Sequence, residues 1–142
     1  MRLALGVVAL LVGSLGFVGQ LVSAIDFRLA QRLGLQESDE GTDRLYRHLE
    51  LNTARLDLLV IWTLPLAGAL MIADHSWWPW AALIAGGIHV DVGIREIGKG
   101  RSLAAEGIRV GSPTEARAGI VFLALVAALG LALVVYALTV VT

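Results

Sequence analysis

The sequence contains no cysteine and only three prolines in 142 residues, and charged residues make up 16% of it. Without cysteine, disulfide bonds and thiolate metal sites are excluded. Aromatic residues account for 6%, whereas hydrophobic residues account for 57% and the mean hydropathy is +0.77. This composition is too apolar for a soluble domain of this length. We therefore expect most of the chain to lie in lipid.

The apolar residues are gathered in four runs, at 3–25, 56–73, 77–94 and 118–141. About 20 apolar residues are needed to cross a hydrocarbon core of ~30 Å. We predict an all-α fold, in which the whole chain forms one integral membrane four-helix bundle. A cleaved signal peptide is the alternative for the first run, because Val22-Ser23-Ala24 resembles a cleavage site. The run is, however, longer than the ~7–15 apolar residues of a signal peptide.

Basic residues predict the orientation of these spans. Ten of the eleven lysines and arginines lie in two segments, 28–55 and 95–117. The positive-inside rule places both segments in the cytoplasm and both termini on the non-cytoplasmic side. The net charge of -1 gives no indication of a nucleic-acid partner. We expect a multi-pass protein of a prokaryotic cytoplasmic membrane, with the lipid bilayer as its first partner.

Local signals predict several helix boundaries and contacts. Ser112-Pro113-Thr114-Glu115 is typical of a capping box at the start of the last helix. Thr42 is the expected cap of the second helix, which we predict to run from Asp43 to Ala73 with a kink at Pro65. Stripes of small residues predict close packing of the first and last helices. These stripes are Gly6, Gly13, Gly16 and Gly19, and Ala124, Ala128 and Ala132.

The start of the second helix is unusually polar. One helical face carries Arg44, Arg47, His48, Leu51, Asn52 and Arg55, and a second carries Tyr46, Glu50, Thr53 and Asp57. Charged side chains at membrane depth must face partner helices. Because arginines bind carboxylates or phosphates through paired hydrogen bonds, the first face predicts a site for an anionic small molecule or lipid head group. The alternative is that its outer arginines only anchor the chain to acidic lipid.

The end of the third helix carries a matching cluster of His89, Asp91, Arg95 and Glu96. Asp91 and Arg95 are four residues apart and should pair on one face. Ionisable residues inside a membrane are a functional hypothesis by default. A purely structural role, with bridges such as Asp91 to Arg55 or Glu96 to Arg47, is the alternative.

The chain resembles the superfamily of membrane-associated proteins in eicosanoid and glutathione metabolism (MAPEG). Tyr46-Arg47 and Asn52 stand where that family has its glutathione contacts, and Gly98-Lys-Gly-Arg101-Ser102 is similar to a Gly-Tyr-x-Arg-Ser segment. Arg55 stands where the family has an acidic residue, with Asp57 the nearest substitute. The resemblance implies a homotrimer with sites between subunits, and a glutathione-dependent transferase or peroxidase acting on lipophilic molecules.

The same resemblance implies roles for individual residues. Arg101 would be catalytic and stabilise the glutathione thiolate. The expected substrate-binding residues are Arg44, Arg47, His48, Asn52, Arg55, Asp57 and Arg95. Glutathione would be the co-substrate, and no metal site is expected.

Two alternatives remain open. His89-Val-Asp-Val-Gly93-Ile94-Arg95 is similar to a His-x-x-x-Gly-Ile-Arg stretch in the cytochrome b anchor subunit of succinate dehydrogenase. That similarity implies a haem b with His89 as an axial ligand, in a respiratory complex. The other alternative is a noncatalytic accessory membrane subunit, and a channel is also consistent with the sequence.

Overall fold

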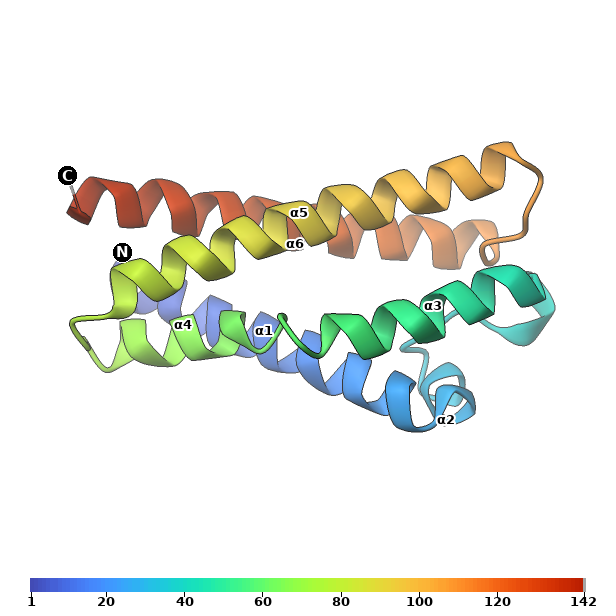
Figure 1. The fold of residues 1–142 in the computed structure, drawn as a ribbon, viewed down its shortest axis with the longest axis horizontal. Helices are drawn as coiled ribbons and strands as arrows, with labels where there is room; N and C mark the ends of the chain where they lie inside the picture. Colours follow the sequence, from blue (N-terminus) through green and yellow to red (C-terminus); the bar gives the residue numbers. More distant parts are fainter. Residues whose placement is uncertain (142) are drawn as a thin grey trace.

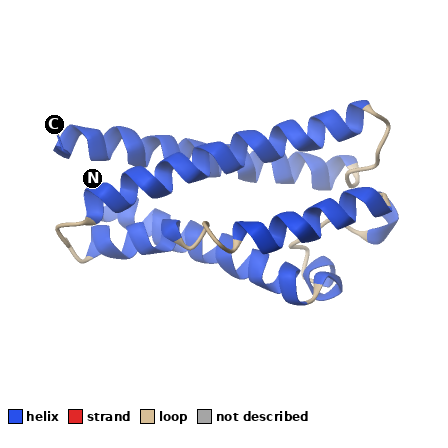
Figure 2. Cartoon of the chain, viewed as in Figure 1, coloured by secondary structure: helices blue, strands red, loops and turns tan. Residues whose placement is uncertain are grey.

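Helices make up nearly all of the chain in the computed structural model, which describes residues 1–141 (Figures 1 and 2). The elements are α1 (Arg2–Ile25), α2 (Phe27–Arg32), the 3-10 turn η1 (Asp39–Gly41), α3 (Arg44–Asp57), α4 (Thr63–Ile72), α5 (Trp78–Ala105) and α6 (Pro113–Val141). Within the described range there is no strand, only an isolated bridge between Thr42 and Val110. The predicted all-α class is confirmed.

The helices lie along one long axis as two pairs (Figure 1). α5 packs along α6, and α1 packs along α4 and α3, while α4 joins the pairs by its contact with α5. Both termini lie at one end, and α2, η1 and the α5–α6 loop lie at the other. Near the terminal end the rings of Trp78 and Tyr136 stack with their centroids 5.5 Å apart. The four apolar runs therefore lie along one axis, and the basic loops lie at one end of it (Figure 1).

Small residues allow close helix contacts in the terminal half of the bundle. A Cβ at Gly68 of α4 would collide with the α1 backbone at Leu10, and a Cβ at Gly86 of α5 would collide with the α6 backbone at Gly130. Gly13 likewise leaves no room for a side chain, because Pro65 lies against it. Helices without a glycine at these crossings could not approach so closely.

The predicted packing stripes are only half right. Gly6 and Gly13 pack against α4, but a Cβ at Gly16 would meet nothing within 4 Å. The prediction for Ala124, Ala128 and Ala132 is wrong, because all three are exposed. The buried face of α6 instead carries Val126, Leu129, Gly130, Leu133 and Ala137. Alanine is common on exposed as well as on buried helix faces, so its spacing alone does not show which face packs against another helix.

The predicted continuous second helix is also wrong, since α3 ends at Asp57 and α4 begins at Thr63. Turn-type hydrogen bonds such as Val60 N to Asp57 O, at 2.9 Å, replace the α-helical pattern between them. Pro65 lacks an amide hydrogen, and its ring would clash with the carbonyl of residue 61 in a straight helix. The chain relieves this clash by breaking the helix upstream of the proline rather than by a kink at it.

The two predicted caps have different outcomes. Ser112 and Glu115 form the capping box, with Glu115 N to Ser112 Oγ at 3.3 Å and Ser112 N to Glu115 Oε2 at 2.7 Å. Thr42 is not the cap of α3, because Asp43 occupies that position and the Thr42 hydroxyl donates to the Ser38 carbonyl instead. The Asp43 carboxylate accepts hydrogen bonds from Arg109, which ties α3 to the α5–α6 loop.

Within residues 1–141, α1 and α6 are long and apolar enough to cross a membrane. α4 is equally apolar but spans ten residues, and α5 carries charged residues over its last third. Large apolar side chains are exposed along both long helices, for example Leu11 at 65% and Leu125 at 64%. Such a surface is unfavourable in water and is typical of a chain in contact with lipid.

Glu115 should stabilise more than its own helix, because its other oxygen accepts from Ser38 N at 3.0 Å. Hydrogen bonds from Ser112 and Ser38 lower the pKa of Glu115 from about 4.5 to about 2. We expect Glu115→Gln to reduce the free energy of unfolding by about 1 kcal/mol in a detergent denaturation experiment.

The pH dependence provides a second check on Glu115. The carboxylate's contribution is present above pH 4.5 and is lost as the pH falls through about 2. The difference between wild type and Glu115→Gln should therefore be constant at neutral pH and shrink below about 4.5. Glu106→Gln, at an exposed carboxylate after α5, is the control and should show no difference. An equal effect of both variants would contradict the assignment.

Candidate functional site

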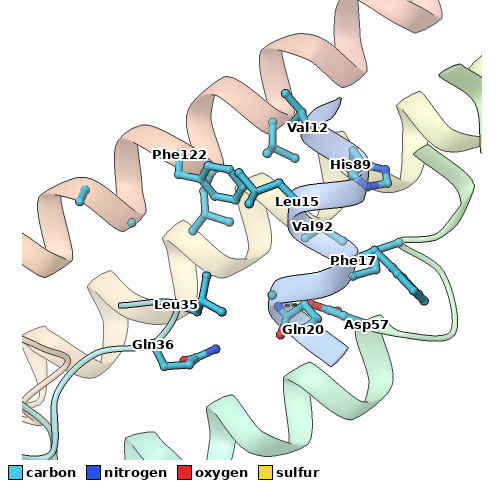
Figure 3. A pocket seen from close by; sticks show the side chains of 18 of the residues that line it. Val12, Leu15, Phe17, Gln20, Leu35, Gln36, Asp57, His89, Val92 and Phe122 are labelled. Carbon is cyan, nitrogen blue, oxygen red and sulfur yellow. Dashed lines mark hydrogen bonds between the residues drawn. The ribbon is translucent and has the colours of Figure 1, made fainter. Parts of the chain in front are cut away.

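A cavity of about 470 Å³ lies between α1, α5 and α6 (Figure 3) and reaches from the middle of these helices to the segment 34–37. Its walls are mainly apolar and include Val12, Leu15, Phe17, Ile61, Leu64, Val92, Phe122, Leu123 and Val126. Leu15 and Phe122 line the cavity but are 59% and 41% exposed. The cavity therefore opens to the outer surface between α1 and α6. Its volume is in the range of sites for small organic ligands.

Glycines of two helices make this space. Gly16 and Gly19 of α1 and Gly119 of α6 line the cavity, and a Cβ at Gly16 or Gly119 would meet nothing within 4 Å. The helices are far apart here, whereas at Gly13 α1 already touches α4. The cavity thus begins where the close packing of the terminal half ends.

One end of the cavity is polar. Gln20 Nε2 of α1 donates to Asp57 Oδ2 at the end of α3, at 3.4 Å (Figure 3). Gln36 Nε2 donates to the Ser23 hydroxyl at 3.1 Å. His89 of α5 is buried, and its Nδ1 lies 2.8 Å from the Ala85 carbonyl. Gln20 and Asp57 thus lie together at one end of the space, whereas His89 lies beside Val12, towards its other end (Figure 3).

A chain of ion pairs extends from this polar end along the facing sides of α3 and α5. Arg95 Nη2 lies 3.3 Å from Asp57 Oδ1, and Arg95 Nη1 lies 3.1 Å from Asp91 Oδ2. One turn further, Lys99 Nζ lies 2.7 Å from Glu50 Oε1 and also pairs with Glu96. Lys99 additionally donates to the Thr53 hydroxyl at 3.1 Å. The predicted Asp91 to Arg95 pair is confirmed, but the partner of Arg95 on α3 is Asp57.

Burial and neighbouring charges shift the pKa values of two groups outside the apolar segments. Burial alone would lower the pKa of Lys99, but Glu50 and Glu96 outweigh it and raise that pKa, so the ammonium stays charged. Burial raises the pKa of Glu37, whose carboxylate accepts from the Tyr46 hydroxyl at 3.1 Å. Charge is thus retained at Lys99 and disfavoured at Glu37.

The segment between α2 and α3 closes the cavity at this end. Gly34, Leu35, Gln36 and Glu37 line it. Gln31 Nε2 donates to the Glu37 carbonyl at 2.8 Å, and Glu115 of α6 accepts from the Ser38 amide. Gly34 has φ of +70°, a conformation that favours glycine. The loop is therefore fastened to both α2 and α6 rather than left free.

The predicted arginine face of α3 points away from this cavity. Arg44, Arg47 and His48, with Phe27 and Leu51, line a separate recess of about 270 Å³. Arg44 Nε donates to His48 Nε2 at 3.3 Å, and Arg47 is paired with Asp39. The arginine face thus provides a shallow surface site with one guanidinium already neutralised.

The remaining predicted residues are distributed over several places. Asn52 and Arg55 are exposed on α3, and Arg101 is exposed near the end of α5. Asp57 and Arg95 meet each other at the cavity's polar end. Within one described chain, the predicted glutathione ligands and Arg101 do not form a single cluster.

Of the three histidines, only His89 lines the cavity. His48 belongs to the surface recess, and His75 accepts from the Trp77 amide in the turn before α5. Residues 1–141 contain no group of three or more His, Cys, Asp or Glu side chains placed to hold a metal ion. The three histidines therefore lie in three separate places of the described chain.

Several residues of the site were not predicted as ligands from the sequence. Gln20 and Gln36 lie at the cavity's polar end, and Glu50 and Lys99 form the central ion pair between α3 and α5. A glutamine inside an apolar run is a usable signal, because it needs a partner in lipid. The Gln20 to Asp57 contact itself depends on the fold, so the sequence alone could not reveal it.

No family model, curated protein or solved structure matches this chain. The functional assignment therefore depends on the geometry of the chain itself.

The Lys99 ion pairs predict a clear pattern of stability. Lys99→Met leaves Glu50 without its cation, close to Glu96, which keeps only Arg95. We therefore expect the free energy of unfolding to fall by about 2–3 kcal/mol. Adding Glu50→Leu should restore most of that loss, and Lys99→Arg should preserve stability. Denaturation of the four proteins in detergent measures this. A double variant no more stable than Lys99→Met would contradict the network.

Proposed function

We propose that this chain is an integral membrane protein that binds a small lipophilic molecule in the cavity between α1, α5 and α6. The observation that carries the proposal is the cavity itself, about 470 Å³ with apolar walls and one polar end. Apolar walls favour a hydrocarbon body, and a few convergent polar groups orient its polar end. No group at the cavity is arranged as a nucleophile with an adjacent base, so we propose binding rather than catalysis.

The position of the opening supports entry from lipid. Leu15 lies midway along α1, and Phe122 lies on α6, the two helices apolar enough to cross a membrane. A mouth between them faces the hydrocarbon if both helices span the bilayer. A lipophilic molecule already dissolved in the bilayer would then reach the cavity without passing through water.

The proposal includes four spans, with the α4 and α5 segments crossing beside α1 and α6. The ion pairs of α3 and α5 would lie at the cytoplasmic interface, where the basic loops are gathered. Both termini, at the opposite end (Figure 1), would lie outside. α3 would run from the interface towards the cytoplasm, which fits its charged composition.

The glutathione-dependent function stays a prediction, as does the trimer. In one chain Arg47 is paired with Asp39, and Asn52 and Arg55 are exposed. A glutathione site would need these residues to be completed by a neighbouring subunit. The cavity is already complete within the chain, so binding of a lipophilic molecule has the stronger support.

Filling the cavity should abolish binding while preserving the fold. Gly16→Leu places a side chain into open space inside the cavity, so we expect it to displace a ligand without collision. The measurement is photolabelling of the protein in lipid nanodiscs by a diazirine analogue of octanol, with the adducts located by mass spectrometry. Wild type should carry adducts on the cavity walls that excess octanol prevents.

Gly87→Leu is the matched control, since Gly87 is also open but is exposed on α5 and does not line the cavity. It should be labelled like wild type, and Gly16→Leu should lose most of the labelling. Equal labelling of all three proteins would contradict the cavity as the site.

The topology can be tested with single cysteines, because the natural chain has none. We expect Ser76→Cys to react with a membrane-impermeant maleimide in intact bacteria, and Glu106→Cys to react only after lysis. Both positions are exposed, in the α4–α5 turn and after α5. Labelling of both from the same side would contradict the four-span arrangement.

A further inference from the structure

The charge at the cavity is of one sign. Three of its lining residues carry carboxyl groups: Asp57, Glu37 and Glu115. No lysine or arginine of residues 1–141 is among the lining residues. Glu115 is occupied by the α6 cap, and the carboxyl group of Glu37 accepts from Tyr46. Asp57 also has partners, the Gln20 amide and Arg95, but Arg95 is half exposed and shared with other carboxylates. Asp57 is therefore the carboxylate that is least compensated at the cavity.

The charge of Asp57 is only partly compensated. Its nearest cation is Arg95, which is half exposed and also pairs with Asp91 and with Glu96. Lys99 lies further along α5 and already pairs with Glu50 and Glu96. Two cations thus serve four carboxylates at the contact of α3 with α5. The surplus is negative, and in a low dielectric it attracts a further positive charge.

The uncharged polar atoms at this end also favour a donor. Gln20 donates to Asp57, and its Oε1 is buried with no hydrogen-bond partner in the described chain. A carbonyl can only accept, so His89 Nδ1 carries the hydrogen that points to the Ala85 carbonyl. In the neutral ring, His89 Nε2 is then a further acceptor, towards the other end of the cavity beside Val12 (Figure 3). A buried acceptor without a donor is costly, and a ligand that supplies N–H groups would relieve that cost.

We propose that the molecule in this cavity is a lipophilic ammonium ion, with Asp57 as its counter-charge and Gln20 Oε1 as an acceptor of its N–H group. This inference rests on the proposed function, because it names the chemical class of the ligand for the same cavity. The apolar walls hold the hydrocarbon part, and the acceptor-rich end holds the positive head. An anionic ligand would meet the Asp57 carboxylate here and no lysine or arginine among the lining residues.

The wild-type protein tests the inference through three probes with the same chain length. Octylammonium, octanol and octanoate are titrated calorimetrically into the protein in phosphatidylcholine nanodiscs, with the heat of empty discs subtracted. We expect octylammonium to bind at least about tenfold more tightly than octanol, and octanoate to bind most weakly. Equal affinity for octylammonium and octanol, or preference for octanoate, would overturn the inference but leave the proposed cavity intact. Absence of binding by all three would overturn the proposed function.

Single-residue variants then test which side chains cause the preference for octylammonium over octanol. Asp57→Asn keeps the size of the side chain and should reduce the octylammonium affinity by about tenfold while changing the octanol affinity little. Gln20→Leu should reduce the octylammonium affinity about threefold to tenfold. Asp91→Asn is the control, because Asp91 also pairs with Arg95 but is exposed and does not line the cavity. A loss in Asp91→Asn as large as in Asp57→Asn would show a general charge effect and overturn the assignment.

An ammonium group could belong to a free amine or to an aminolipid. The quaternary head of phosphatidylcholine has no N–H donor, whereas phosphatidylethanolamine has three. Repeating the titration in discs with added phosphatidylethanolamine distinguishes the two sources. A weaker apparent affinity for octylammonium there identifies the aminolipid as an occupant, and an unchanged affinity identifies a free amine.

Discussion

Long charged side chains, rather than close backbone packing, connect α3 to α5, and the site depends on this connection. Lys99 reaches Glu50 and Thr53, and Arg95 reaches Asp57, across a separation that small apolar residues could not bridge. In the terminal half, by contrast, glycines bring α1 against α4 and α5 against α6. The bundle is therefore tight at one end and spread at the other. The cavity occupies the spread half, with the ion pairs beside it.

The break between α3 and α4 makes this change of spacing possible. Pro65 ends the upstream helix and lies against Gly13, so α4 begins its close approach to α1 where no side chain intervenes. Upstream, the turn at Leu58 to Trp62 places Asp57 as the last residue of α3, directed to Gln20 and Arg95. In a continuous helix, the Asp57 carboxylate would have a different position and direction. The interruption of the helix upstream of Pro65 therefore also positions Asp57 at the site.

The sequence predicted the helical class, the capping box at Ser112 and the Asp91 to Arg95 pair, because these depend on composition or on neighbours within one helix. It also showed that α3 has two polar faces. It could not show which face is buried, because that depends on the helix break and on where α5 lies. Nor could it locate the cavity, since Gly16 and Gly6 are equivalent in spacing and only one of them has a neighbour. The distances between helices, which locate the cavity, cannot be read from the sequence.

The two faces of α3 support opposite expectations for a ligand, and their surroundings decide between them. The arginine face is accessible to solvent or lipid head groups, where the attraction between charges is screened and one guanidinium is already paired with Asp39. The acidic face meets α5 and the cavity, where Asp57 is buried and water is scarce. The same two charges at the same separation interact far more strongly in the buried cavity than at the exposed surface. The proposed ligand selectivity is therefore assigned to the buried face, even though the exposed face carries more charges of one sign.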